Sequence, residues 1–205
     1  MRLKVGLLGG GSWGTTVAAV VSRNAPIILW ARDAETVEGI NRDNENRKYL
    51  PGIKLPTVLR ATGDMAEVVA GADVLVMGVP SHSFRAVLEE ARHHLRPWVP
   101  VISLTKGLEL SSGQRMTQLI EEILPGHPVG VLTGHVGIAD QHLVATPDPA
   151  YPQAIRLLQG FLAECEQRGE LGQLEHLHAT VVARDHEHEA VIDSGDAIRP
   201  RQLAD

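Results

Sequence analysis

The chain has 205 residues, 43% of them hydrophobic, and a formal net charge of −6, a composition that predicts one globular domain with room for an appendage. Its lysines and arginines are scattered and no apolar run reaches the about 18 residues of a membrane span, so we expect neither nucleic-acid nor membrane binding. The only cysteine, Cys165, excludes an intramolecular disulfide and favours a cytoplasmic location.

Short apolar runs alternate with amphipathic stretches through residue 134. The first run reaches glycine within nine residues, which predicts a strand and not a signal peptide. Apolar runs of this kind predict strands buried on both faces, and they cover 4–10, 26–32, 57–62, 73–80, 99–107 and 127–134. Helical spacing between the runs predicts helices over 13–24, 33–44, 63–72, 81–95 and 111–126. Prolines and glycine predict a loop over 49–56.

Strict alternation of buried-type strands and helices predicts an α/β fold, with a parallel sheet covered on both faces. Because crossovers are right-handed, we expect a doubly wound, Rossmann-like sheet over residues 1–134, with the first strand in a central position. In such sheets, ligands bind beyond the carboxyl ends of the strands.

The regular alternation fades after residue 134. Three prolines predict a loop over 134–152, helical spacing predicts a helix over 153–169, and the charged tail beyond is predicted to fray. We therefore expect a divergent, partly helical C-terminal extension over 135–205. It is too short for a second core of typical domain size.

The stretch GGGSWGTT opens the first predicted helix with the pattern G-x-G-x-x-G, formed by Gly9, Gly11 and Gly14. In this pattern the first glycine permits a tight turn, the second lets the backbone approach a pyrophosphate, and the third lets the helix pack closely on the sheet. The helix N-terminus then faces the anion. The strand–turn–helix context predicts a dinucleotide site; the alternative is that the glycines serve only the turn.

The second predicted strand ends at Arg32 and Asp33, where the ribose of a dinucleotide is expected. An acidic residue at this point favours a free 2′-hydroxyl, whereas an arginine accommodates a 2′-phosphate. Asp33 can equally cap the following helix, and Arg32 can stack on adenine or bind phosphate. The pair leaves NAD and NADP both open as cofactors, with a slight preference for NADP.

Residues 1–134 resemble the NAD(P)-dependent glycerol-3-phosphate dehydrogenase family through five segments in the family's order and spacing: GGGSWGT, LWARD, NRKYLPGIKLP, VPSHSFRAVL and SLTKGLE. The resemblance implies hydride transfer between NAD(P)H and dihydroxyacetone phosphate, a small phosphorylated substrate, giving sn-glycerol 3-phosphate for phospholipid synthesis. It also implies that Ser12, Trp13 and Arg32 contact the cofactor and that Lys106 lies near both nicotinamide and substrate. The alternatives are a Trp13 that only covers the sheet edge and a solvated surface Lys106.

The resemblance stops at Gly134, the last residue that matches a substrate-contacting segment of the family. The family continues with proline and then asparagine or serine, where this chain has His135 and Val136. A helical domain with a second lysine, the proton acceptor, then follows in the family, whereas no lysine follows Lys106 here. We therefore expect that helical domain to be truncated or replaced, the catalytic residue stays unassigned, and a homodimer is compatible with the sequence.

Histidines offer other chemistry, as acids, bases or metal ligands. The charged tail contains two H-x-H pairs, His176 with His178 and His186 with His188. Residues two apart do not share a helix face, so we expect a solvated segment and no metal site. His82 follows a strand end and either lines the crevice or only begins a helix. The candidate functions are the dehydrogenase, a non-catalytic dinucleotide-binding remnant, and a related reductase with another small substrate.

Overall fold

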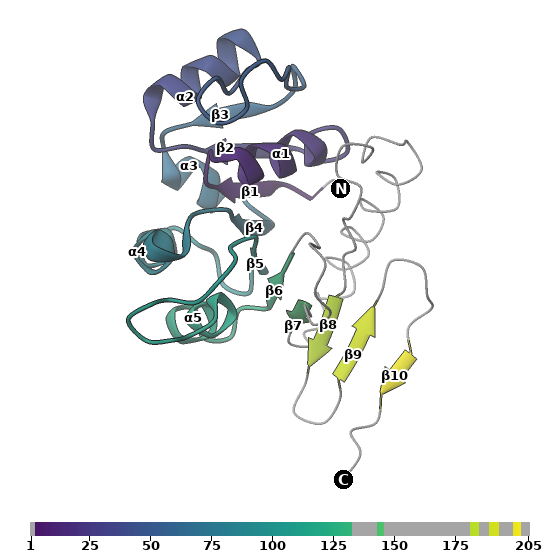
Figure 1. The fold of residues 1–205 in the computed structure, drawn as a ribbon. Coiled ribbons are helices and arrows are strands. Elements are labelled where there is room, and N and C mark those ends of the chain that lie inside the picture. Colours follow the sequence, from purple (N-terminus) through teal and green to yellow (C-terminus); the bar gives the residue numbers. More distant parts are fainter. Residues whose placement is uncertain (1–2, 133–142, 146–180, 185–188, 193–198, 202–205) are drawn as a thin grey trace. The chain divides into compact units, whose positions relative to one another are not determined.

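The computed structural model describes residues 3–132, 143–145, 181–184, 189–192 and 199–201. The chain divides into two compact units, residues 1–127 and 128–205. The strands form a six-stranded sheet in the order β3-β2-β1-β4-β5-β6 and a four-stranded sheet in the order β10-β9-β8-β7 (Figure 1).

The six-stranded sheet has its first strand in a central position, as the sequence predicts. Its strands are β1 (Val5–Leu8), β2 (Ile27–Trp30), β3 (Arg60–Thr62), β4 (Val74–Met77), β5 (Val101–Ser103) and β6 (Val129–Val131). The strand β1 pairs in parallel with β2 and β4, which pair in parallel with β3 and β5. This is the strand order of a doubly wound dinucleotide-binding sheet, whose ligands lie where the order reverses, between β1 and β4.

Helices connect the strands, and they are α1 (Ser12–Val21), α2 (Ala34–Glu38), the π-helix η1 (Gly39–Asp43), α3 (Met65–Ala70), α4 (Ser81–Arg92) and α5 (Met116–Ile123). Gly6 and Leu7 are neighbours on β1 and so face opposite sides of the sheet. A Cβ on Gly6 would lie 2.8 Å from the Val68 carbonyl oxygen of α3, and a Cβ on Gly14 of α1 would lie 3.3 Å from Leu7. Helices α1 and α3 therefore cover opposite faces of β1.

The core lies between the sheet and the helices, because the central strands β1 and β4 are apolar. All four residues of β4 are buried, which is expected of a strand with helices on both faces. The largest fully buried side chains come from strands and from the inner sides of helices, and include Phe84, Leu7, Leu29, Leu75, Leu88 and Ile120. No helix in the described part of the chain is long and apolar enough to cross a membrane.

Two predicted helices differ most from the structure in their extent. The stretch 33–44 is not one regular α-helix: α2 passes into η1, which ends at Asn44 in the left-handed conformation, with φ 51°. The stretch 111–126 becomes helical only at Met116, because an antiparallel bridge between Leu108 and Arg115 closes the preceding residues into a turn. Gly113, with φ 70°, supplies the backbone conformation that this turn needs.

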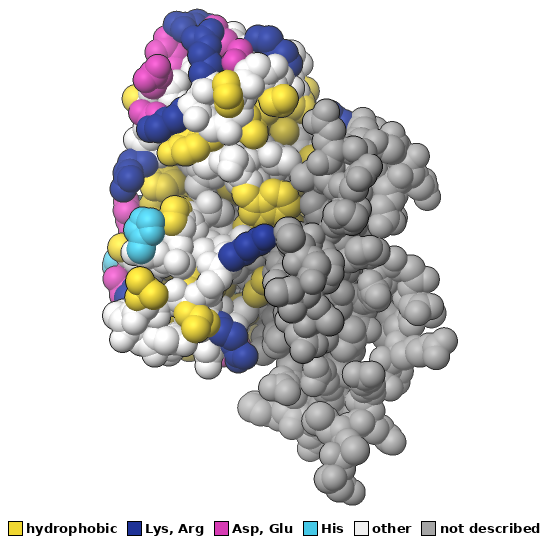
Figure 2. Space-filling view, viewed as in Figure 1, with side chains coloured by type: hydrophobic (Ala, Val, Ile, Leu, Met, Phe, Trp, Pro, Cys, Tyr) yellow, Lys and Arg dark blue, Asp and Glu magenta, His cyan; other side chains and the backbone are white. Residues whose placement is uncertain are grey.

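Charged side chains of both signs gather over the end of the domain that carries α2 and η1 (Figures 1 and 2). Arg42 pairs with Glu38 and with Asp43, and Arg47 also pairs with Asp43 at 3.1 Å. Exposed pairs of this kind contribute only about 0–1 kcal/mol each to stability. Because the charges are mutually paired, this end of the domain presents no surface of a single sign.

The described residues of the C-terminal unit form strands. The strand β7 (Leu143–Ala145) pairs in parallel with β8 (Val181–Arg184), and β9 (Glu189–Ile192) pairs antiparallel with β8 and with β10 (Arg199–Arg201). The apolar residues of β7 thus pair as a strand inside the stretch predicted as a loop, and β8–β10 lie in the tail predicted to fray. The helix predicted over 153–169 lies outside the described residues, and the domain boundary after residue 134 stays a prediction.

Candidate functional site

The carboxyl ends of four parallel strands are aligned by their register. Leu8 lies opposite Trp30 and Met77, and Met77 lies opposite Ser103. The residues just beyond this row are the glycine loop, here defined as residues 9–14, the Arg32 segment, the turn after β4, and the segment that carries Lys106. The fold therefore brings the N-terminal site residues predicted from the sequence to one edge of the sheet.

Gly9 and Gly14 are required by close backbone approaches. Gly9 has φ 127°, and a Cβ there would lie 2.4 Å from the Gly78 carbonyl oxygen of the turn after β4. A Cβ on Gly14 would lie 2.0 Å from the Gly9 carbonyl oxygen. Both distances are impossible for a real side chain, so these glycines serve the tight turn and the close packing of helix on strand.

Gly11 differs from its neighbours, because a Cβ there would meet nothing within 4 Å. Its φ of −72° suits any residue, so neither backbone conformation nor internal packing explains a glycine at this position. It is the N-cap of α1, which has no side-chain cap and no acidic residue in its first turn. The open space thus lies at a helix N-terminus, whose unpaired N–H groups and dipole favour an anion. These features fit the pyrophosphate of a dinucleotide.

The Trp13 indole N–H is buried and has no hydrogen-bond partner, the only such side-chain polar atom among the described residues. The corresponding N–H of Trp30 donates to the Gly63 carbonyl oxygen at 3.1 Å. A buried donor without an acceptor is costly, and an acceptor supplied by a ligand is one way to satisfy it. Ser12, beside Trp13, is exposed in the first turn of α1.

Arg32 and Asp33, at the end of β2, have different surroundings. Arg32 is exposed and forms no ion pair with a described residue. Asp33 is the N-cap of α2, but its carboxylate accepts from the Thr36 hydroxyl at 2.8 Å and from Lys48 at 3.5 Å instead of capping the helix backbone. The Thr36 hydroxyl, followed by Lys48, lowers the pKa of Asp33. Asp33 therefore has internal partners, whereas Arg32 does not.

Lys106 is exposed beyond the end of β5, in the lysine loop, defined here as residues 104–115. The loop is fixed at its start, where the Thr105 hydroxyl donates to the Val79 carbonyl oxygen at 2.6 Å. This bond ties the loop to the turn after β4. Gly107, with φ 91° and open space around it, follows directly. Lys106 thus lies on a loop whose first residues are fixed, at the same edge of the sheet as the glycine loop.

Arg85 of α4 also holds the lysine loop, through Glu109, a role that the sequence does not predict. Its guanidinium donates to both carboxylate oxygens of Glu109, at 2.8 and 3.0 Å, and to Glu122 of α5 at 2.7 Å. The Ser112 hydroxyl also donates to Glu109, at 2.6 Å. The Arg85 guanidinium and the Ser112 hydroxyl lower the pKa of Glu109 to about 2. The only sequence signal was the opposite charge of residues 24 positions apart.

The remaining predicted residues fall in two groups. His82 is exposed in the first turn of α4, directly after the turn that approaches Gly9. The described residues contain no group of three histidine, cysteine or acidic side chains that could hold a metal ion. Outside the described residues lie Gly134, His135, Val136 and the four tail histidines, His176, His178, His186 and His188.

The chain is similar to curated glycerol-3-phosphate dehydrogenases [NAD(P)+]. It is 88% identical to one from Sphingopyxis alaskensis over 134 residues, which cover 65% of this chain and 40% of that protein. It is 54% identical to one from Mycobacterium avium over 132 residues, 64% of this chain and 39% of that protein. The chain thus spans well under half the length of the curated relatives that it matches.

Solved structures show the same fold. A glycerol-3-phosphate dehydrogenase from Saccharomyces cerevisiae aligns with a TM-score of 0.66 and 27% identity, over 78% of this chain and 54% of that one. One from Coxiella burnetii aligns with a TM-score of 0.67 and 24% identity, over 78% and 51%. The model of the family described as NAD-dependent glycerol-3-phosphate dehydrogenase N-terminus matches residues 4–147. The resemblance seen in the sequence is therefore confirmed, and the chain belongs to this family.

Proposed function

We propose that this chain binds NAD(H) or NADP(H) at the glycine loop. The observation that carries the proposal is the open space at Gly11, a residue whose backbone conformation and packing do not need a glycine. A backbone without a side chain at a helix N-terminus admits phosphates into contact with N–H groups. Ser12 and Trp13 would line the same turn, and an acceptor on the cofactor would satisfy the buried Trp13 N–H.

We further propose a preference for NADP(H) over NAD(H). An acidic residue at the end of the second strand selects the free ribose 2′-hydroxyl only if its carboxylate is available to accept from it. One oxygen of the Asp33 carboxylate, Oδ2, is already engaged by Thr36 and Lys48. Arg32 is exposed and has no ion-pair partner among the described residues, so its guanidinium is available for a 2′-phosphate.

The reaction proposed is the reduction of dihydroxyacetone phosphate to sn-glycerol 3-phosphate in the cytoplasm, feeding phospholipid synthesis. The bound cofactor supplies the hydride. The role we assign to Lys106 is to bind the substrate and to stabilise negative charge on its carbonyl oxygen with the ammonium group. The Thr105 hydrogen bond that fixes the start of the lysine loop supports this role, because a charge already held in position needs little reorganisation during the reaction. Gly134 is proposed to contact the substrate as well.

A second candidate function is dinucleotide binding without efficient turnover. Residues 107–205 contain no lysine, and His135 and Val136 stand where the family has proline and asparagine or serine. General acid–base help of the kind that a second lysine gives is worth about 10²–10⁴-fold in rate. A cofactor site without such a group would give binding but slow reduction.

Two measurements on the unmodified chain separate these functions. Isothermal titration calorimetry with NADPH and with NADH is expected to show saturable binding of at least one, and binding of neither would contradict the proposed site. NADPH oxidation with dihydroxyacetone phosphate then distinguishes the candidates. Turnover within about tenfold of a typical enzyme's ~10 s⁻¹ supports the dehydrogenase. Binding without measurable oxidation supports the second function.

A further inference from the structure

Asn46 is a fully buried polar residue between the helix predicted over 33–44 and the loop predicted over 49–56. Its side-chain amide donates to the Gly10 carbonyl oxygen at 2.9 Å and to the Thr15 hydroxyl oxygen at 2.8 Å. Its amide oxygen accepts from the Tyr49 backbone N–H at 3.2 Å. Both amide donors of Asn46 are therefore used on the glycine loop and on the first turn of α1.

The two residues that Asn46 binds, Gly10 and Thr15, lie on either side of Gly11 in the sequence. Gly10 precedes Gly11, and Thr15, itself fully buried, donates its backbone N–H to the Gly11 carbonyl oxygen at 2.9 Å. A bond from Asn46 holds the Gly10 carbonyl oxygen against the protein interior. A carbonyl oxygen turned toward the open space would repel an anion, because its partial charge is negative. Asn46 thus fixes which way the peptide groups around Gly11 point.

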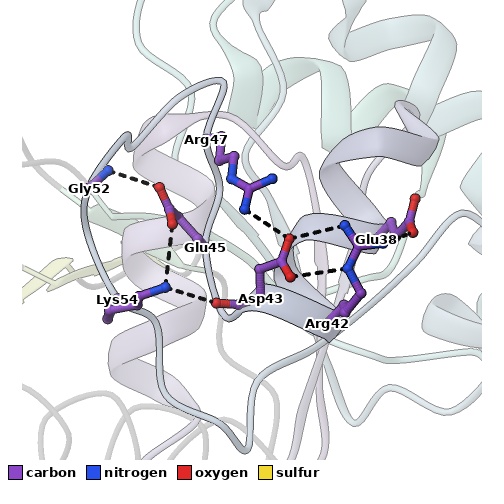
Figure 3. A network of polar contacts seen from close by, with 7 residues as sticks. All are labelled: Glu38, Arg42, Asp43, Glu45, Arg47, Gly52 and Lys54. Carbon is purple, nitrogen blue, oxygen red and sulfur yellow. Dashed lines mark hydrogen bonds and ion pairs between the residues drawn. The ribbon is translucent and has the colours of Figure 1, made fainter.

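Polar contacts also join the two ends of the segment that carries Asn46, residues 43–54 (Figure 3). The Glu45 carboxylate accepts from the Gly52 backbone N–H at 3.0 Å and from Lys54 at 3.4 Å. Lys54 also donates to the Asp43 carbonyl oxygen at 3.2 Å. The adjoining Asp43 side chain pairs with Arg42 and Arg47 on the other side (Figure 3). The contacts of Glu45 and Lys54 therefore hold Asn46 in its position against the glycine loop.

We propose that Asn46 is a positioning residue for dinucleotide binding. It holds the Gly10 carbonyl and the first turn of α1 so that the N–H groups beyond Gly11 face the phosphates. This inference rests on the proposed function, because it concerns the same site. It adds a residue that does not touch the ligand and acts through the backbone of the glycine loop.

A variant of Asn41, an exposed asparagine with similar backbone bonds, tests the proposal against a merely structural role. Asn41, on η1, makes two comparable bonds to the backbone of Ala61, donating to its carbonyl and accepting from its N–H, each at 2.8 Å. Neither bond involves the glycine loop. Asn46→Ala and Asn41→Ala should both lower the melting temperature. At a temperature where both are folded, Asn46→Ala should weaken NADPH and NADH binding about tenfold or more, and Asn41→Ala less than about twofold.

A second pair of variants decides the question should Asn46→Ala fail to fold. Thr15→Ser keeps the hydroxyl that Asn46 holds and should keep dinucleotide affinity, although it removes a buried methyl group. Thr15→Val keeps the shape but loses the hydroxyl, and should lose affinity. Affinities that follow the melting temperature in all four variants would overturn the proposal, as would an Asn46→Ala affinity equal to that of the unmodified chain. Binding of neither dinucleotide by the unmodified chain would instead overturn the proposed function and this inference together.

Discussion

The glycine loop and the lysine loop lie at the same edge of the sheet, but different forces hold them. The glycine loop is fixed by backbone groups that approach too closely for any side chain and by the neutral amide of Asn46. The lysine loop, beyond the neutral bond of Thr105 at its start, is fixed by charge, through Arg85 and the carboxylates of Glu109 and Glu122. Close packing thus holds the glycine loop, whereas ion pairs hold the lysine loop.

This difference predicts opposite sensitivities for the two loops. Packing and neutral hydrogen bonds do not depend on protonation, but at Gly9 and Gly14 the packing cannot accept even one added methyl group without strain. An ion-pair network tolerates changes of size more readily, but it loses its stabilising effect when a carboxylate is protonated. Steric variants should therefore affect the glycine loop, and acid should affect the lysine loop.

The largest effect is expected from Gly14→Ala. Its Cβ would lie 2.0 Å from the Gly9 carbonyl oxygen, and a backbone atom cannot rotate away as a side chain can. We expect a loss of at least about 3 kcal/mol in the free energy of unfolding, measured by urea denaturation. The control is Gly63→Ala, whose Cβ would be 3.9 Å from the Ala31 carbonyl oxygen, an ordinary contact. Equal stability of the two variants would contradict the steric account.

An intermediate effect, dependent on pH, is expected from Glu109→Gln. The Arg85 guanidinium and the Ser112 hydroxyl lower the pKa of Glu109 from 4.5 to about 2, so the ionised group stabilises the fold above pH 4.5. That stabilisation is lost as the pH falls through the window from 4.5 to about 2. The difference in melting temperature between the unmodified chain and Glu109→Gln should therefore be widest above pH 4.5 and close as the pH approaches 2.

The control for this measurement is Glu121→Gln, which alters an exposed acid on α5 beside Glu122. It should leave the melting temperature nearly equal to that of the unmodified chain at every pH. A difference in melting temperature between Glu109→Gln and the unmodified chain that stayed constant at every pH would show that ionisation does not hold the lysine loop.

The smallest expected effect concerns cofactor choice. Arg32→Ala should weaken NADPH binding about tenfold and leave NADH binding within about twofold, because only NADPH carries the 2′-phosphate. Calorimetric titrations with both dinucleotides measure the ratio. Equal weakening of the two would mean that Arg32 contacts a part common to both, such as adenine, and the proposed preference for NADP(H) would then be wrong.

Much of the fold was predictable from the sequence, because the signals are local. Apolar runs such as VGLL and VLVM are continuous, as buried parallel strands require, and the glycine pattern marks the first turn. The break of 33–44 into α2 and η1 was not predictable. The helical spacing continues through both, and the left-handed Asn44 that ends η1 has no distinctive neighbour in sequence.

Less of the candidate site's support was predictable. Gly9, Gly11 and Gly14 belong to one pattern, although the sequence does not reveal that only Gly11 faces open space. Asn46 contacts residues 36 and 31 positions away, and nothing in NRKYLPG marks its asparagine as buried. The pairing of Arg85 with Glu109 is likewise a product of the tertiary fold. Contacts between distant segments depend on how the helices dock, and no local pattern encodes this.

The most direct test of the dinucleotide site is the affinity of Gly11→Val. A Cβ at Gly11 meets nothing within 4 Å and φ is −72°, so the variant should fold, with a melting temperature lowered only by valine's poorer N-capping of α1. Gly71→Val, at the other end of the sheet, is the matched control; its Cβ would make only an ordinary 3.6 Å contact with the Glu67 carbonyl oxygen. Calorimetry should show NADPH and NADH binding weakened at least about 100-fold in Gly11→Val and unchanged in Gly71→Val. A folded Gly11→Val variant that binds either dinucleotide as tightly as the unmodified chain would contradict the assignment of this space to the cofactor.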